Sequence, residues 1–226
     1  MNPQILPVIH YKNLDLALKN ADIVARAGCP GLFLIEMNGN NEPLDRAAKK
    51  IRAEWPHMRI GINRLDADPV SAVQHHIDTN IDMTWTDQQL THSQVGNWNA
   101  VEHLRETIRK AQHQLFSGVA FKYQAYEPDP ATAARSAIEY GLIPTTSGPG
   151  TGMPADTQAI AGLRKAIGPK APLAIASGIT PENVASYASY LSHILVATGI
   201  ASDFYNLDAE RLKSLKNQIE KPAVAP

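Results

Sequence analysis

Eight short apolar runs alternate with longer amphipathic segments along the chain, and this alternation limits the possible fold more than any other feature. The runs expected to form strands are residues 5–9, 31–37, 58–63, 82–86, 116–122, 142–146, 173–177 and 193–197. The segments expected to form helices are residues 14–28, 42–55, 69–80, 100–115, 129–140, 156–167, 181–190 and 208–220. Strands that alternate with helices favour a parallel sheet, because each helix returns the chain to the same edge.

Two α/β architectures share this alternation, the open doubly wound sheet and the closed (β/α)8 barrel. Eight near-equal units in 226 residues leave no strand over, and the length matches that of the smaller barrels. We therefore expect a single-domain (β/α)8 TIM barrel over residues 1–220, followed by a loose C-terminal tail at 221–226.

Composition and charge argue against several classes of function. The formal net charge is −1 and there is no polybasic run, which speaks against binding to nucleic acid or to an anionic membrane. No apolar run approaches the length of a membrane span, and the first residues lack the regions of a signal peptide. The one cysteine, Cys29, cannot form an intrachain disulfide and fits a reducing compartment. We therefore expect a cytoplasmic protein with no nucleic-acid partner and no membrane span.

Three glycine-rich stretches follow the last three expected strands, at residues 144–156, 174–183 and 194–200. Ligand sites in (β/α)8 barrels lie at the C-terminal ends of the strands. Glycine lets the backbone approach a ligand closely, and a helix that starts beyond the turn offers free N–H groups to an anion. We therefore expect one phosphate cradle that contains Ser147, Gly150, Thr151, Gly152, Ser177, Gly178, Thr198 and Gly199.

Earlier expected strands end in ionisable residues, which are candidates for acid–base chemistry: His10, Glu36, Asp87 and Lys122. Glu36 suits a general base if it is desolvated, and its alternative is a paired structural carboxylate. Lys122 suits a general acid, a phosphate partner or a Schiff-base former, and a lysine that reaches solvent at the rim is an equal alternative. For Asp87 the stronger alternative is a loop cap, and for His10 it is a satisfied histidine at the edge of the core.

Asn63 and Arg64 follow the third expected strand, where they would orient the substrate or contact its anion if they face inward. Arg64 is equally compatible with a solvated position. The adjacent His75 and His76 would point in different directions on a helix and make a poor metal pair. Because no other metal-binding motif is present, we expect no metal site and no cofactor, with Mg²⁺ held partly by a substrate phosphate left open.

The stretches at 146–156, 176–184 and 195–200 resemble the BtpA family and, more distantly, phosphoribosylanthranilate isomerase and the tryptophan synthase α chain. All of these belong to the ribulose-phosphate-binding barrel group. The most specific element is Ser177-Gly-Ile-Thr-Pro-Glu-Asn-Val184, and the likeness covers the last third of the chain. The resemblance implies a phosphate site on Gly150, Thr151, Gly152, Ser177, Gly178, Thr198 and Gly199.

About the reaction the resemblance implies less. The isomerase uses a cysteine at the end of its first strand, where this chain has His10. The tryptophan synthase α chain has a catalytic glutamate at the end of its second strand, which Glu36 matches, but its partner aspartate has only Asp66 or Asp68 as loose counterparts. BtpA-like proteins are associated with the assembly or stability of photosystem I.

Two functions therefore stay open. The first is an isomerase or lyase that acts on a phosphorylated sugar or nucleotide-like small molecule, with Glu36 as base and with Lys122 and Asp87 as acid or electrostatic partners. The second is a BtpA-like ligand-binding or assembly factor that keeps the phosphate cradle without the chemistry. In both, the partner is a phosphorylated small molecule, and a homo-oligomer is compatible with either.

Overall fold

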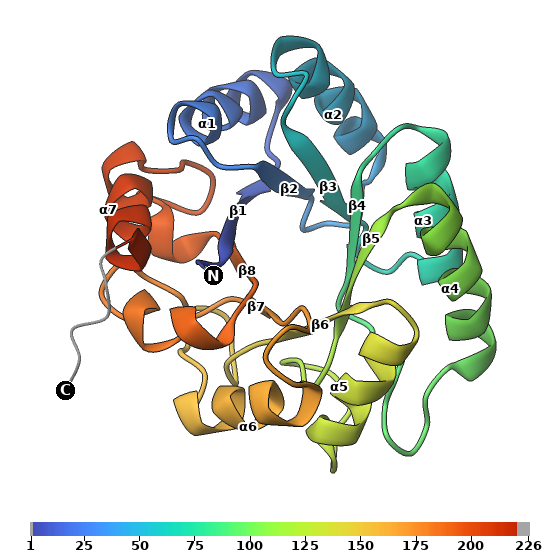
Figure 1. Cartoon of the computed structure of the whole chain (residues 1–226). Coiled ribbons are helices and arrows are strands. Elements are labelled where there is room, and N and C mark those ends of the chain that lie inside the picture. Colours follow the sequence, from blue (N-terminus) through green and yellow to red (C-terminus); the bar gives the residue numbers. More distant parts are fainter. Residues whose placement is uncertain (1, 221–226) are drawn as a thin grey trace.

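The strands enclose a barrel and the helices surround it, as Figure 1 shows for the computed structural model, which describes residues 2–220. The strands are β1 (Gln4–His10), β2 (Gly31–Ile35), β3 (Arg59–Asn63), β4 (Met83–Thr86), β5 (Gln114–Gly118), β6 (Ile143–Thr146), β7 (Ala174–Ala176) and β8 (His193–Val196). The α-helices are α1 (Leu14–Arg26), α2 (Glu42–Glu54), α3 (Pro69–Asp78), α4 (Trp98–Ala111), α5 (Pro130–Glu139), α6 (Thr157–Ile167) and α7 (Ala209–Glu220). Within residues 2–220, no helix is both long and apolar enough to cross a membrane.

The sheet is closed and entirely parallel. Neighbouring strands follow one another in chain order, and β8 completes the ring by pairing with β1, with Gln4 opposite His193 and Pro7 opposite Val196. Closure also brings α7 beside α1, although the two helices come from opposite ends of the chain (Figure 1). The expected (β/α)8 barrel is thereby confirmed, and the open sheet is excluded.

Apolar side chains fill both sides of the barrel wall. In β2, Phe33 and Ile35 belong to the core inside the barrel, while Leu32 and Leu34 belong to the core between the barrel and the helices. This burial on two faces explains why the strands read as continuous apolar runs. Inside the barrel the ring of Phe33 lies against Gly61, where a Cβ would overlap it. The interior is therefore packed, and a ligand site has to lie at one end of the barrel.

The largest error in the expected boundaries concerns α4 and β5. We expected a helix over 100–115 and a strand over 116–122, whereas α4 ends at Ala111 and β5 ends at Gly118. Gln112 adopts a left-handed conformation (φ 53°) that ends the helix, so that Leu115 becomes part of the strand. As a consequence, Lys122 lies in the loop after β5 and not in the strand itself.

Two short 3-10 turns, Val184–Ser186 and Ala188–Tyr190, replace the α-helix that we expected over 181–190. The side chain of Asn183 folds back on the preceding turn, where Oδ1 accepts from the N–H of Thr180 at 2.9 Å and Nδ2 donates to the carbonyl of Gly178 at 2.8 Å. Such bonds compete with helix formation. This unit therefore presents no helix N-terminus to an anion. The expected tail at 221–226 lies outside the described residues.

Candidate active site

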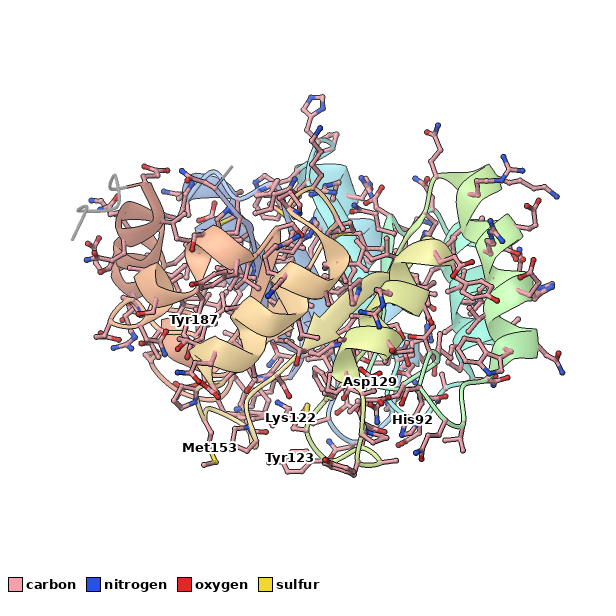
Figure 2. All side chains as sticks on the ribbon, turned by 60° about the horizontal axis from the view of Figure 1, so that its bottom comes forward. His92, Lys122, Tyr123, Asp129, Met153 and Tyr187 are labelled. Carbon is pink, nitrogen blue, oxygen red and sulfur yellow. The ribbon has the colours of Figure 1, made fainter. Side chains whose placement is uncertain are left out.

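A cavity of ≈ 170 Å³ opens at the C-terminal ends of the strands, which we call the mouth of the barrel. Both strand residues and the loops that follow the strands contribute to its walls. The lining residues are Val8, His10, Ile35, Met37, Leu65, Trp85, Asp87, Lys122, Tyr123, Thr151, Ser177, Leu195, Ala197, Thr198 and Phe204. Figure 2 shows Lys122, Tyr123 and Met153 together at this end of the barrel, along the lower edge of the view.

The cavity brings together several residues that the sequence places at the site. They are His10, Asp87, Lys122, Thr151, Ser177 and Thr198. Each comes from the end of a different strand or from the loop after it, which is how a (β/α)8 barrel assembles a ligand site. Asn63, at the end of β3, reaches the same group through a hydrogen bond to Asp87.

Asp87 follows β4 and is half-buried. Its Oδ1 accepts a hydrogen bond from Nδ2 of Asn63 at 3.1 Å. Burial raises the pKa of the Asp87 carboxyl, and the bond from Asn63 and the cation of Lys122 oppose part of that rise. A carboxylate with a raised pKa accepts a proton more readily at neutral pH. Asp87 is therefore suited to the role of general base.

Lys122 lies in the turn after β5, between two positions with unusual backbone geometry. Ala120 (φ 47°) and Tyr123 (φ 62°) are left-handed, a conformation that non-glycine residues rarely adopt and that gathers at functional sites. The backbone N–H of Lys122 donates to Oγ of Ser147 at 2.8 Å, which fixes this turn to the loop after β6. Burial lowers the pKa of the Lys122 amine, while Asp87 acts to raise it. The amine is thereby suited to give up a proton.

His10 ends β1 and stacks on Phe204 from the loop after β8, with ring centres 4.2 Å apart. Its Nδ1–H donates to the carbonyl oxygen of Phe204 at 2.8 Å. Because a carbonyl oxygen can only accept, the proton of the neutral ring is on Nδ1 and Nε2 is left as an acceptor. Burial lowers the pKa of His10, and Lys122 lowers it further against the effect of the Phe204 bond. His10 therefore presents a neutral imidazole to the cavity.

Close backbone packing explains the glycines in the turns after β6, β7 and β8. A Cβ at Gly148 or Gly178 would overlap the carbonyl oxygen of Met153, and a Cβ at Gly199 would overlap that of Ile179. The close approach that glycine permits here is thus between neighbouring turns. The N–H groups of Gly178, Ile179 and Gly199 belong to buried residues and meet no protein acceptor within residues 2–220. A buried N–H without a partner is costly, so these donors are suited to an anion.

The loop after β6 is held on both sides by neighbouring loops. The N–H of Thr151 donates to the hydroxyl of Tyr123 at 3.1 Å, and the N–H of Gly152 donates to Oγ of Ser177 at 3.0 Å. Gly150 lies close beneath, where a Cβ would stand 3.4 Å from the Tyr123 hydroxyl. In this arrangement the N–H groups of Thr151 and Gly152 already have acceptors. Anion binding therefore rests more on the turns after β7 and β8 than on this loop.

Two of the expected site residues do not line the cavity. Glu36 is buried, but its carboxylate accepts two backbone N–H groups and one side-chain N–H from the turn 38–40, at 2.8–2.9 Å, and so caps its own loop. Arg64 forms an ion pair with Asp45 of α2 and donates from Nε to Nε2 of His76 at 3.0 Å. The expectation that Arg64 faces inward is corrected, because its guanidinium lies between α2 and α3. Glu36 is not available as a base in this conformation.

The adjacent histidines of α3 have separate partners, as expected. Nε2 of His76 accepts from Arg64, and Nδ1 of His76 donates to Oγ1 of Thr84 at 2.6 Å, so both of its ring nitrogens are occupied. His75 lies instead against Asp45, at 2.9 Å. Across the described part of the chain, no group of three or more His, Cys, Asp or Glu residues is placed to hold a metal ion.

Loop 87–99 supports the turn after β5 from outside. The side-chain oxygen of Gln89 accepts from the N–H of Ala120 at 3.1 Å. The N–H and hydroxyl of Ser93 both donate to the buried carboxylate of Glu127. This long polar loop is therefore a brace for the mouth of the barrel.

Part of the cavity wall could not be recognised from the sequence. Phe204 lies in an irregular loop, and its contact with His10 spans 194 residues, so no local pattern announces it. Trp85 reads as one more apolar residue of a strand. Tyr123 had one available signal, which is its position directly after Lys122.

No protein-family model matches the chain, and no curated protein matches it. Solved structures do match. KGPDC from Streptococcus mutans, in complex with D-ribose 5-phosphate, has a TM-score of 0.71 at 12% identity, over 96% of this chain and 97% of that chain. Phosphoribosyl anthranilate isomerase from Thermus thermophilus has a TM-score of 0.65 at 15% identity, over 96% and 98%. Orotidine 5'-monophosphate decarboxylase from Methanocaldococcus jannaschii, complexed with the inhibitor BMP, has a TM-score of 0.71 at 13% identity, over 98% and 100%. At such identities the likeness shows that this chain shares the barrel fold of these proteins.

Proposed function

We propose that this protein is an enzyme that binds a phosphorylated sugar or nucleotide-like small molecule at the mouth of the barrel and transfers a proton on it, as an isomerase or a lyase. One observation carries the proposal. Asp87, Lys122 and His10 converge on one cavity, and buried residues in the turns beside them have N–H groups that meet no protein acceptor within residues 2–220. A reactive group and an anion site are thus close enough to serve one small ligand.

The acid–base roles follow from the direction of the pKa shifts. Burial raises the pKa of Asp87 and lowers that of Lys122, so that both move towards neutral pH. Proton transfer is most efficient when the pKa of the catalytic group lies near the working pH. We assign Asp87 as the base that takes a proton from a substrate carbon, and Lys122 as the acid or cation for the oxygen that gains charge. Nε2 of His10 is a second acceptor in reach of the cavity.

The phosphate is assigned to the turns after β7 and β8. The N–H groups of Gly178, Ile179 and Gly199 and the hydroxyls of Ser177 and Thr198 are the donors there. Two structures of the same fold support a ligand of this kind, since one contains D-ribose 5-phosphate and the other is named for orotidine 5'-monophosphate. The resemblance of these turns to the BtpA family and its group points the same way.

The proposed reaction uses no resident metal and no cofactor, and Mg²⁺ would come only with the substrate phosphate. We place the protein in the cytoplasm, and the site is compatible with a homo-oligomer.

Hydrogen–deuterium exchange on the substrate tests the reaction. The protein is incubated in D₂O with a panel of sugar phosphates and nucleotides, and ¹H NMR follows the loss of each C–H signal. We expect one C–H signal to be lost, and Asp87→Asn to slow that loss by about 100-fold or more. Asp66→Asn is the matched control, because Asp66 is exposed, follows β3 and does not line the cavity.

A thermal-shift screen with the same panel separates binding from chemistry. If no phosphorylated compound raises the melting temperature, the proposal fails as a whole. If exchange continues unchanged in both Asp87→Asn and Lys122→Ala while ligands still bind, the enzymatic part fails.

That second result would favour a BtpA-like ligand-binding or assembly factor. One observation supports this alternative: large apolar side chains are exposed in loops around the mouth of the barrel. They are Met37, Tyr123, Tyr126, Met153 and Phe204. Clustered exposed apolar residues are typical of surfaces that bind another protein.

A further inference from the structure

The floor of the cavity is apolar. Val8, Ile35, Trp85 and Leu195 are buried members of the core inside the barrel, and each also lines the cavity. Leu65 and Ala197 pack against the same core and extend this surface, while Met37 and Phe204 continue it at the rim. A ligand that enters the cavity therefore meets hydrocarbon on the side that faces the barrel.

The floor offers no hydrogen-bonding group to a ligand. Trp85 is its one side chain with a polar atom, and that indole nitrogen is buried away from the cavity surface. The polar groups of the cavity are instead those already assigned. The hydroxyls of Ser177 and Thr198 stand beside the phosphate donors, and the ionisable groups stand where the reaction is placed.

A polyhydroxylated chain fits such a floor poorly. Each hydroxyl that leaves water without a new partner carries a desolvation cost, and a sugar phosphate has a hydroxyl on most of its carbons. A flat apolar ring carries no such cost. The size agrees as well, because the cavity measures ≈ 170 Å³ and an apolar cavity of about 150 Å³ is enough to hold one benzene ring.

We infer that the ligand carries an aromatic or similarly flat apolar ring next to its phosphorylated part, and that this ring lies on the floor formed by Val8, Ile35, Trp85 and Leu195. This inference rests on the proposed function for its phosphate site. It goes further by choosing the nucleotide-like or aryl class over the simple sugar phosphates.

Isothermal titration calorimetry with three probes tests this choice. Phenyl phosphate supplies a ring and a phosphate, D-ribose 5-phosphate supplies hydroxyls and a phosphate, and inorganic phosphate supplies the anion alone. We expect phenyl phosphate to bind about tenfold or more tightly than D-ribose 5-phosphate, because the ring buries apolar surface on the floor.

Variants locate the effect. Val8→Thr keeps the shape of the side chain and adds a hydroxyl to the floor, so it should weaken phenyl phosphate about fivefold or more and leave inorganic phosphate unchanged. Ala197→Ser makes the same change nearer the rim, and serves if Val8→Thr melts early. The matched control is Val95→Thr, since Val95 is 72% exposed and lies outside the cavity.

The outcomes separate this inference from the proposed function. If D-ribose 5-phosphate binds as tightly as phenyl phosphate, or if the floor variants leave their ratio unchanged, the ring is wrong and the phosphate site stands. If none of the three probes binds, the phosphate site is wrong and the inference falls with it.

Discussion

Gly199 illustrates how a residue that marks a motif can serve a different partner from the one the motif suggests. Its Cβ position is taken by the carbonyl oxygen of Ile179, so glycine is required for the turn after β8 to pack on the turn after β7. The sequence indicates that the backbone comes close to something at this position. Only the fold shows that the something is another turn, and that the donors Gly178 and Gly199 are brought together by this packing.

Replacement of Gly199 by alanine tests this requirement. The added methyl group would meet backbone atoms that cannot rotate away, so Gly199→Ala should lower the free energy of unfolding by about 1–3 kcal/mol. Gly162→Ala is the control, because Gly162 lies within α6 with open space around its Cβ position. There alanine should raise the free energy of unfolding by about 0.5–1 kcal/mol. Urea denaturation measures both, and equal stability of Gly199→Ala and the wild type would contradict the packing argument.

The ionisable residues show what single positions in a sequence can and cannot tell. The rule that sites lie at strand ends selected His10, Asp87 and Lys122, which the cavity does unite. The same rule selected Glu36, whose carboxylate instead accepts hydrogen bonds from the turn 38–40. Whether a carboxylate serves a cavity or its own loop depends on where nearby N–H groups point, and that direction is set by the folded loop.

At the level of elements, the sequence predicted existence well and boundaries less well. Strands such as β2 are continuous apolar runs because both of their faces are buried, and such runs are easy to find. The boundary between α4 and β5 was misplaced because Leu115 continues the apolar pattern of the helix into the strand. The helix expected at 181–190 is absent because side-chain bonds of Asn183 outcompete it, and periodicity does not report such bonds.

The loop after β6 should loosen when its anchor to the loop after β5 is removed. Tyr123→Phe deletes the hydroxyl that accepts the N–H of Thr151. A hydrogen bond of this kind contributes about 1 kcal/mol, so amides in 150–153 should exchange with D₂O about fivefold faster, with little change in global stability. Tyr126→Phe is the control, since Tyr126 is 86% exposed in the same loop. Equal exchange rates in the two variants, followed by mass spectrometry, would show that the Tyr123 hydroxyl does not hold the loop.

At the level of the whole molecule, buried histidines tie the stability of the barrel to pH. Nδ1 of His76 donates to Oγ1 of Thr84, whose hydroxyl then donates to Nε2 of His113 at 2.8 Å. Burial lowers the pKa of His76 to about 2 and that of His113 to about 4. His193 lies at the start of β8, where burial lowers its pKa to about 4 and its Nε2 has no partner within residues 2–220. All three rings are therefore neutral in the folded protein at neutral pH.

Acid should unfold this protein in a window that these histidines set. Between about pH 4 and their ordinary pKa of 6.5, the unfolded chain binds protons on His76, His113 and His193 that the folded chain does not. The free energy of unfolding is then complete above pH 6.5 and falls as the pH falls, by up to about 1.4 kcal/mol per pH unit for each histidine. Asp87 acts with the opposite sign, because burial raises its pKa. His113→Gln should make the fall shallower by one histidine, whereas His57→Gln, at an exposed position, should leave the slope of the wild type. Urea denaturation at intervals from pH 4 to pH 7 measures these slopes, and a slope that His113→Gln leaves unchanged would show that the ring of His113 is already protonated in the folded barrel.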